Sequence, residues 1–410
     1  MSKVSQLSLR TNFSWNFIGS LVYSASQFLI LVLLAKLGSP EMVGLYSIGL
    51  AITAPIINLT NLQLRQIQAT DAEEVDYKFN DYFGLRILSG IIMLCITLFI
   101  IMLNAYYLEK AIIIFLVGLT KVMDSYSDVV YGQLQQRERM DYIGKSRIIK
   151  GTSTIIVMGI VLATTTNLII SLIALNILWL VIFLVYDRKK LNLFLDNIKP
   201  NFSLTKFKKL FILAFPLGVV LMLGSLNTNL PRIIVEKYLG EAALGYFASI
   251  TYLLVAGNMF VQAVGQAAAP RLAKLYYEGK VQKFKQIINY LLLIGASIGI
   301  IGIFISVVLG EFILTLLYDS SYAEYNQLLI LVMITGIFSF SRSFLGHALT
   351  AMRYFKIQPY INLLGLITIL ISSLVLIPVY KLNGAAYTLI IGHITQFTLY
   401  FAVIQYRLRN

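Results

Sequence analysis

Residues 187–209 read DRKKLNLFLDNIKPNFSLTKFKK and hold seven of the 33 Lys and Arg residues of this 410-residue chain. Long apolar runs lie on both sides of this basic segment, and 58% of all residues are hydrophobic whereas only 13% are charged. Such a composition is too apolar for a protein whose whole surface meets water. We therefore predict an all-α polytopic membrane protein that the basic segment divides into two halves.

The apolar runs give the number of expected membrane spans. A spanning helix needs roughly 20 apolar residues, and the chain offers twelve such runs, six before the basic segment and six after it. We predict an N-terminal six-helix bundle at residues 1–190, a cytoplasmic basic linker at 191–206 and a C-terminal six-helix bundle at 207–410. The expected spans are residues 12–35, 42–62, 83–104, 111–132, 147–164, 167–186, 207–228, 242–263, 286–309, 325–347, 358–377 and 384–404.

The basic residues indicate how the chain is oriented in the membrane. Of the 33 Lys and Arg residues, 26 fall in alternate gaps between spans, including both chain ends and the five from Arg137 to Lys150. The positive-inside rule places these 26 in the cytoplasm, so we expect both termini to be cytoplasmic. Topology accounts for the net charge of +14, so no nucleic-acid partner is indicated. Five basic residues lie on the other side: Lys36, Lys110, Arg232, Lys237 and Lys381.

The two halves resemble each other in sequence. After the first expected span, residues 37–46 read LGSPEMVGLY, and after the seventh, residues 239–246 read LGEAALGY. Because each half has an even number of spans, the halves would be parallel repeats about an axis along the membrane normal. Such repeats usually surround a central cavity, which favours alternating access over a static pore.

The fourth expected span carries charges inside an apolar stretch. At about 100° per residue, Lys121, Asp124 and Asp128 share one helical face, and Lys121 lies about 15 Å below the external end. A charge at that depth costs roughly 2.5–3.5 kcal/mol, so this face should point into the bundle or a wet cavity. We expect Lys121 to bind substrate and the two aspartates to couple ions. The alternative is a Lys121–Asp124 pair that neutralises itself, with Asp128 hydrated near the cytoplasm.

Other polar residues in the spans are further candidates for the substrate site. Arg342 is the cation of the tenth span, which corresponds to the fourth, and Arg65 and Arg271 end the second and eighth. Snorkelling to the interface, topology marking and interhelical hydrogen bonds are the alternatives for such residues. The full predicted substrate set is Lys121, Arg342, Arg65, Arg271, Arg232, Tyr23, Gln27, Asn58, Asn227 and Gln262.

Several chemistries lack their usual residues. The chain has no Gly-rich ATP-binding loop and no Ser/His/Asp set in an aqueous loop, so we expect a transporter rather than an enzyme. Cys95 is the only cysteine and the two histidines stand alone, so neither a disulfide nor a metal site is expected. We expect no cofactor, and any coupling would be to H⁺ or Na⁺.

Three segments carry a resemblance to a known family. Residues 33–52 (LLAKLGSPEMVGLYSIGLAI), 229–247 (NLPRIIVEKYLGEAALGYF) and 80–90 (NDYFGLRILSG) resemble the polysaccharide-transporter branch of the multidrug/oligosaccharidyl-lipid/polysaccharide exporter (MOP) superfamily. Within that branch, the chain is most similar to flippases of the Wzx type, which serve O-antigen and capsule synthesis. Many relatives carry an Asp before the arginine that matches Arg232, whereas this chain has Pro231, so only Arg232 carries over.

The resemblance implies a substrate, a cellular location and partners. The substrate would be an undecaprenyl-diphosphate-linked oligosaccharide, moved from the cytoplasmic to the external leaflet of a bacterial cytoplasmic (inner) membrane by alternating access. The protein would be a monomer among membrane lipids, next to a polysaccharide polymerase and a chain-length regulator. The alternative is a cation-coupled exporter of drugs or small molecules, and a membrane-embedded glycosyltransferase is a third reading. A net positive cavity would favour the flippase, and an anionic one the drug exporter.

Overall fold

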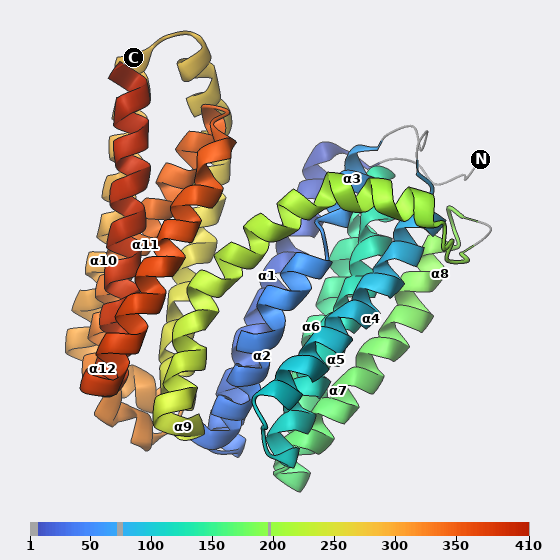
Figure 1. The fold of residues 1–410 in the computed structure, drawn as a ribbon, viewed down its shortest axis with the longest axis horizontal. Helices are drawn as coiled ribbons and strands as arrows, with labels where there is room; N and C mark the ends of the chain where they lie inside the picture. Colours follow the sequence, from blue (N-terminus) through green and yellow to red (C-terminus); the bar gives the residue numbers. More distant parts are fainter. Residues whose placement is uncertain (1–6, 72–76, 196–197, 410) are drawn as a thin grey trace. The chain divides into compact units, whose positions relative to one another are not determined.

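The computed structural model describes residues 7–71, 77–195 and 198–409, in which the chain is almost entirely helical (Figure 1). Lys3, at the amino terminus, and Asp196 and Asn197, in the predicted linker, lie outside the described residues. Within the described ranges, nine helices are long and apolar enough to cross a membrane. The chain is therefore a multi-pass membrane protein, as predicted. The count of twelve spans, the internal repeat and the cytoplasmic termini stay predictions.

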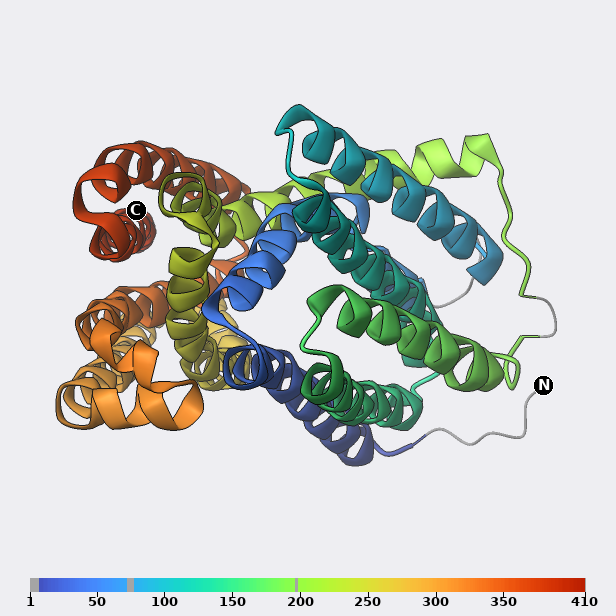
Figure 2. The ribbon, with the colours of Figure 1, turned by 90° about the horizontal axis from the view of Figure 1, so that it is seen from below.

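The chain divides into two compact units, residues 1–225 and 226–410. The first unit contains α1 (Leu9–Leu37), α2 (Pro40–Thr60), α3 (Leu64–Thr70), α4 (Phe79–Leu103), α5 (Leu108–Gln136), α6 (Met140–Thr165) and α7 (Leu168–Ile182), a π-helical turn (Phe183–Asp187), α8 (Arg188–Leu191) and the beginning of α9 (Leu204–Tyr277). Helix α5 packs against α2, α4 and α7, and α1 packs along α6. Figure 2 shows α1, in dark blue, beside the sea-green α6.

Local sequence signals begin several of these helices. The side chain of Ser39 accepts a hydrogen bond from the Met42 amide at 3.3 Å, and Pro40 occupies the first turn of α2. Such capping satisfies amide groups that have no partner within the helix. Between helices, a Cβ on Gly19 of α1 would lie 2.6 Å from the Cα of Gly144 in α6. Only glycine permits this approach, which sets α1 and α6 close together.

The second unit contains the rest of α9, α10 (Val281–Leu317), a 3₁₀ turn (Ser320–Tyr325), α11 (Asn326–Ala351), a short 3₁₀ turn (Phe355–Ile357) and α12 (Gln358–Arg409). In Figure 1, α10, α11 and α12 run side by side. Two of the helices are interrupted, α9 at Gly240 (φ 85°, ψ −179°) and α12 at Lys381 (φ 52°, ψ −131°). These breaks fall between the expected spans 207–228 and 242–263, and between 358–377 and 384–404.

One boundary differs from the prediction in a way that matters for the site. The fifth span was expected to begin at residue 147, but α6 begins at Met140. The segment from Arg137 to Lys150, whose basic residues were counted on the cytoplasmic side, therefore lies largely within a helix. Lys150 is only 1% exposed there. Its burial is possible because a carboxylate and a hydroxyl of α5 contact its ammonium.

Candidate functional site

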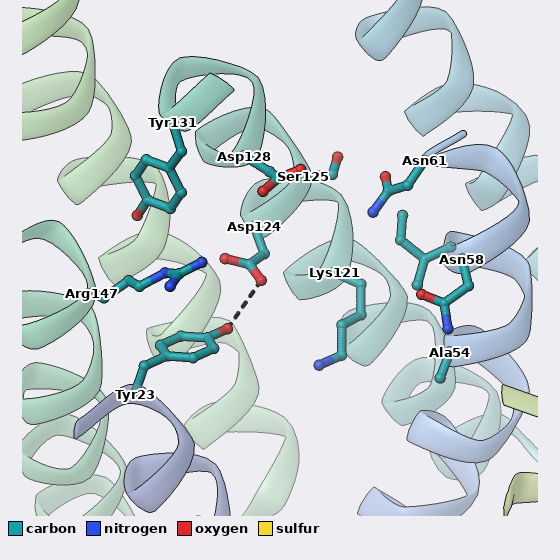
Figure 3. A pocket seen from close by; sticks show the side chains of 11 residues that line it. Tyr23, Ala54, Asn58, Asn61, Lys121, Asp124, Ser125, Asp128, Tyr131 and Arg147 are labelled. Atoms are coloured by element: carbon teal, nitrogen blue, oxygen red, sulfur yellow. Dashed lines mark hydrogen bonds between the residues drawn. The ribbon is translucent and has the colours of Figure 1, made fainter. Parts of the chain in front are cut away.

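The first unit contains a polar cavity of about 320 Å³ between α1, α2, α5 and α6 (Figure 3). We call it the charged cavity. Of the residues predicted from the sequence, it brings together Tyr23, Asn58, Lys121, Asp124 and Asp128. Its lining consists of Tyr23, Ala54, Ile57, Asn58, Asn61, Lys121, Asp124, Ser125, Asp128, Tyr131 and Arg147.

Asp124 is held by groups from two other helices. The Tyr23 hydroxyl of α1 donates to Asp124 Oδ2 at 3.0 Å, which Figure 3 marks, and Lys150 Nζ of α6 donates to Oδ1 at 3.4 Å. Lys150 also donates to Ser127 Oγ at 2.7 Å. No ion pair joins Lys121 to Asp124 in the part of the chain that the structure describes. The self-neutralising pair that the sequence allowed is therefore replaced by a Lys150–Asp124 pair between helices.

Asp128 is bound by two arginines. Arg65 Nη1 of α3 lies 3.2 Å from Asp128 Oδ1, and Arg86 Nη2 of α4 lies 3.6 Å from Oδ2. Arg86 is 0% exposed, and it also donates to the main-chain carbonyl of Asn61 at 3.1 Å and to the Asn61 side-chain oxygen. Arg65 donates through Nε to Gln135 at 3.1 Å. Arg65, a predicted site residue, thus reaches the charged cavity through Asp128.

Lys121 and Arg147 are the two cavity-lining cations that have no carboxylate partner among the described residues. Arg147 donates to neutral oxygens, to Ser20 Oγ at 2.6 Å and Asn16 Oδ1 at 3.5 Å. Figure 3 shows the Lys121 ammonium and the Arg147 guanidinium both pointing into the cavity. These two side chains are therefore available to an anion.

The balance of charge at the cavity is positive. Lys121 and Arg147 line it, and Lys150, Arg65 and Arg86 bind its two carboxylates, so five cations face two anions and the net charge is +3. Asp187 accepts from Ser146 at 2.6 Å and does not line the cavity; including it gives +2. The site thus favours an anionic ligand by electrostatics alone.

Three of these cations are not among the site residues predicted from the sequence. Arg147 and Lys150 were counted among the cytoplasmic topology markers, although the expected span 147–164 contains both, and both lie in α6. Their spacing of three residues was an available signal, since it puts both on one helical face. Arg86 lies in the segment 80–90 that carries the family resemblance, but its position near the start of a span gave no reason to assign it to a site.

The remaining predicted residue of the first unit lies outside the cavity lining. Gln27 follows Tyr23 by about one turn of α1, and its side-chain amide nitrogen is buried without a hydrogen-bond partner among the described residues. A role for Gln27 in binding substrate stays a prediction.

The predicted residues of the second unit have different surroundings. Asn227 donates to the Asn362 carbonyl at 3.1 Å, and Gln262 donates to Ser343 Oγ at 3.1 Å, which are interhelical bonds of the kind left open as the alternative. Buried Arg232 donates to Asn229 at 3.3 Å and Thr251 at 3.4 Å. Arg271 is exposed, and Arg342 has a buried Nε with no hydrogen-bond partner in the described ranges. Their binding roles stay predictions.

Comparisons with known proteins cover nearly the whole chain. A family model described as "Polysaccharide biosynthesis protein" matches residues 9–276. The capsular polysaccharide biosynthesis protein CapF of Staphylococcus aureus is 34% identical over 395 residues, which are 95% of this chain and 98% of CapF.

Solved structures share the fold at low sequence identity. The lipid II flippase MurJ, in an inward closed conformation, matches with a TM-score of 0.76 at 14% identity, over 95% of this chain and 87% of its own. An inward-facing multidrug resistance transporter of the MATE family and MOP superfamily matches with a TM-score of 0.70 at 13% identity, over 98% of this chain and 95% of its own. Identities this low establish the fold alone.

Proposed function

Because the chain belongs to the polysaccharide biosynthesis protein family, as its sequence resemblance indicated, we propose that it moves a lipid-linked oligosaccharide across a membrane. The substrate is an oligosaccharide on undecaprenyl diphosphate, and it passes from the cytoplasmic to the external leaflet of the bacterial cytoplasmic membrane. The product supplies the synthesis of a surface polysaccharide. A fold shared with solved transporters over almost the whole chain supports transport rather than catalysis.

The observation that carries this proposal is the pair of cations in the charged cavity that have no carboxylate partner among the described residues. Asp124 and Asp128 are each bound by Lys or Arg side chains, whereas Lys121 and Arg147 have no carboxylate partner among the described residues. A diphosphate offers several anionic oxygens to such donors, and hydrogen bonds between charged groups are the strong ones. A site of low water content strengthens them further.

The other parts of the substrate fit the same site chemically. Asn58 and Asn61 supply amide donors and acceptors for sugar hydroxyls, and the Tyr23 ring can lie against a sugar face. Leaving the hydrocarbon of the bilayer would not lower the free energy of the lipid tail. The cavity therefore needs to hold only the polar head group of the substrate. Alternating access would open this cavity to each leaflet in turn.

The charge balance argues against export of cationic drugs. Such an exporter needs a carboxylate that is free to exchange H⁺ or Na⁺ for its substrate. Here Asp124 and Asp128 already have partners 3.2 to 3.6 Å away, and the net charge repels a cation. This favours a role for both aspartates as fixed counter-charges over the predicted role in ion coupling.

The test combines depletion of the protein with complementation. We expect depletion to leave lipid-linked repeat units on the inner leaflet and to abolish surface polysaccharide, and wild type to restore export. Lys121→Ala and Arg147→Ala should each lower export by about 10- to 100-fold, because each removes a charged hydrogen bond to the diphosphate. Quantified surface polysaccharide, normalised to the amount of protein in the membrane, is the measurement.

The matched control is Lys283→Ala, which removes an exposed lysine of α10 in the second unit. It should restore export fully. Normal surface polysaccharide after complete depletion, in a host without a second flippase, would overturn the proposed function. Full export by both cavity variants would overturn the role of the charged cavity.

A further inference from the structure

The second unit contains a separate pocket of about 560 Å³ that none of the site predictions include. Three chain turns form it: the break of α9 at Gly240, the 3₁₀ turn that leads into α11, and the break of α12 at Lys381. We call it the tyrosine pocket, because each turn contributes one tyrosine ring: Tyr238, Tyr325 and Tyr380.

Backbone strain is located at this pocket. Lys381 has φ of 52°, one of seven positive φ values at described non-glycine residues, and such a left-handed conformation costs free energy in a residue with a side chain. The break there turns Tyr380 and Asn383, on either side of Lys381, toward one pocket. Gly240, with φ of 85°, makes the corresponding break in α9 without a steric penalty.

The pocket lies at the end of the second unit that is predicted to be external. From Lys381 to Arg409, α12 rises about 42 Å at 1.5 Å per residue, which is a full membrane thickness. The carboxyl terminus is therefore at the other end of the unit, and in the predicted topology that end is cytoplasmic. Lys381 and Lys237 belong to the few basic residues assigned to the external side.

The lining has the chemistry of a carbohydrate site. Tyr238 is 48% and Tyr380 is 54% exposed, so these rings offer apolar faces with a hydroxyl at the edge. Gln327 and Asn383 add planar amides that both donate and accept hydrogen bonds. A ligand that matches apolar ring faces and closely spaced donors and acceptors is a pyranose, which has C–H faces and a rim of hydroxyl groups.

Charge and ring packing separate this pocket from the charged cavity. Glu324 and Lys381 are the charged lining residues among those described, so the tyrosine pocket has no net charge. The Tyr325 ring is stacked on Tyr246 with centroids 4.2 Å apart, which fixes its orientation before any ligand arrives. A neutral, preorganised aromatic site favours sugar over diphosphate.

We propose that the tyrosine pocket binds the sugar portion of the transported substrate, a short oligosaccharide, on the external side of the second unit. This inference rests on the proposed function and deepens it, because it assigns the sugar a further site in the second unit, in addition to the polar groups that the charged cavity offers. The stacked and exposed tyrosines bind the sugar faces, and Glu324, Gln327 and Asn383 bind its hydroxyls.

The experiment measures two ligands on the same protein in lipid nanodiscs, which leave both faces accessible and contain no sugar-bearing detergent. One probe is the repeat-unit oligosaccharide that mild acid releases from the lipid-linked intermediates of the host, and the other is inorganic pyrophosphate. The Tyr238→Ala/Tyr380→Ala variant should bind the oligosaccharide about tenfold or more weakly, because two ring contacts are lost, and pyrophosphate as wild type does. Lys121→Ala should bind pyrophosphate more weakly than wild type does and the oligosaccharide as wild type does.

The control is Tyr290→Ala/Tyr360→Ala, which removes two tyrosines that are 68% and 64% exposed and do not line the pocket. It should bind both probes as wild type does. Unchanged oligosaccharide affinity in the Tyr238/Tyr380 variant overturns the inference. If wild type binds pyrophosphate but not the oligosaccharide, the inference fails and the proposed function stands. If the oligosaccharide binds through the tyrosines but pyrophosphate does not bind, the inference stands and the charged cavity is not a diphosphate site.

Discussion

The buried cations of the two units differ in what surrounds them. In the first unit, fully buried Arg86 and Lys150 each meet a carboxylate, Asp128 and Asp124. In the second unit, Arg232 donates to neutral oxygens of Asn229 and Thr251, and neither Arg232 nor Arg342 has a carboxylate partner among the described residues. These buried cations therefore have unequal electrostatic surroundings in the two units.

The difference between the surroundings of the buried cations in the two units comes from the acidic residues rather than from the basic ones. Helix α5 carries Asp124 and Asp128 within its span, whereas α11, the helix expected to correspond to it, contains no Asp or Glu. The first unit can therefore hold several neighbouring cations and remain stable, whereas the cations of the second unit are isolated. We infer that anion chemistry belongs to the first unit, and that the second serves neutral parts of the substrate.

The largest expected effect comes from removing the carboxylate that two arginines share. Asp128→Ala leaves Arg86 buried without a counter-charge, which should cost about 3 kcal/mol of stability. We expect the thermal midpoint, followed by circular dichroism in detergent, to fall by about 5 °C or more. Export should be lost as well.

Two further variants test whether the loss of stability comes from the unpaired charge of Arg86. Glu278→Ala breaks a surface ion pair with Lys280 in the second unit and should not change the midpoint measurably. Adding Arg86→Met to Asp128→Ala should restore most of the stability but not export, because the unpaired charge is gone while the site remains altered. A midpoint of Asp128→Ala equal to wild type would refute the network as a structural element of the first unit.

A smaller effect, on the affinity for an anion, is expected from replacing Asp124, the second carboxylate of the charged cavity. Asp124→Asn keeps an oxygen that can accept from Tyr23 but removes a negative charge from the cavity, and it frees Lys150 to face an anion. Pyrophosphate should therefore bind about tenfold more tightly, which corresponds to about 1.4 kcal/mol. Isothermal titration at low and high salt measures this, and the gain should shrink as salt screens the cavity. Weaker binding by Asp124→Asn would mean that Asp124 orients the cations rather than limiting their charge.

The sequence predicted much of the fold and one face of the site. The helical face that joins Lys121, Asp124 and Asp128 was recognisable because a single helix sets the spacing, and all three line one cavity. The partners of the aspartates were not recognisable, because Lys150 lies 26 and Arg65 lies 63 positions away in the chain. Only packing of α3, α4 and α6 around α5 brings them together.

The rule that predicted the topology also explains why two residues of the charged cavity were not recognised. Positive residues near the end of a span usually mark the cytoplasm, so Arg147 and Lys150 were counted only as topology markers. The half-buried carboxylate of Asp124, one helix away, lowers the cost of placing Lys150 inside its helix. Composition alone cannot show such compensation between helices.

The smallest predicted effect tests the second unit directly. Arg342→Met removes a guanidinium whose Nε is buried without a hydrogen-bond partner in the described part of the chain, and methionine fills a similar volume with apolar atoms. We expect the protein without ligand to gain about 1 kcal/mol, because an uncompensated polar group is removed. Arg86→Met in the first unit is the matched control, and it should lower the thermal midpoint, since it removes one of the two arginines that bind Asp128 and leaves the Asn61 carbonyl without this donor. Lower stability for both variants would show that Arg342 is compensated as well as Arg86, and the contrast between the two units would then fail. Higher stability of Arg342→Met together with reduced export would show that this arginine is kept for transport at the expense of stability.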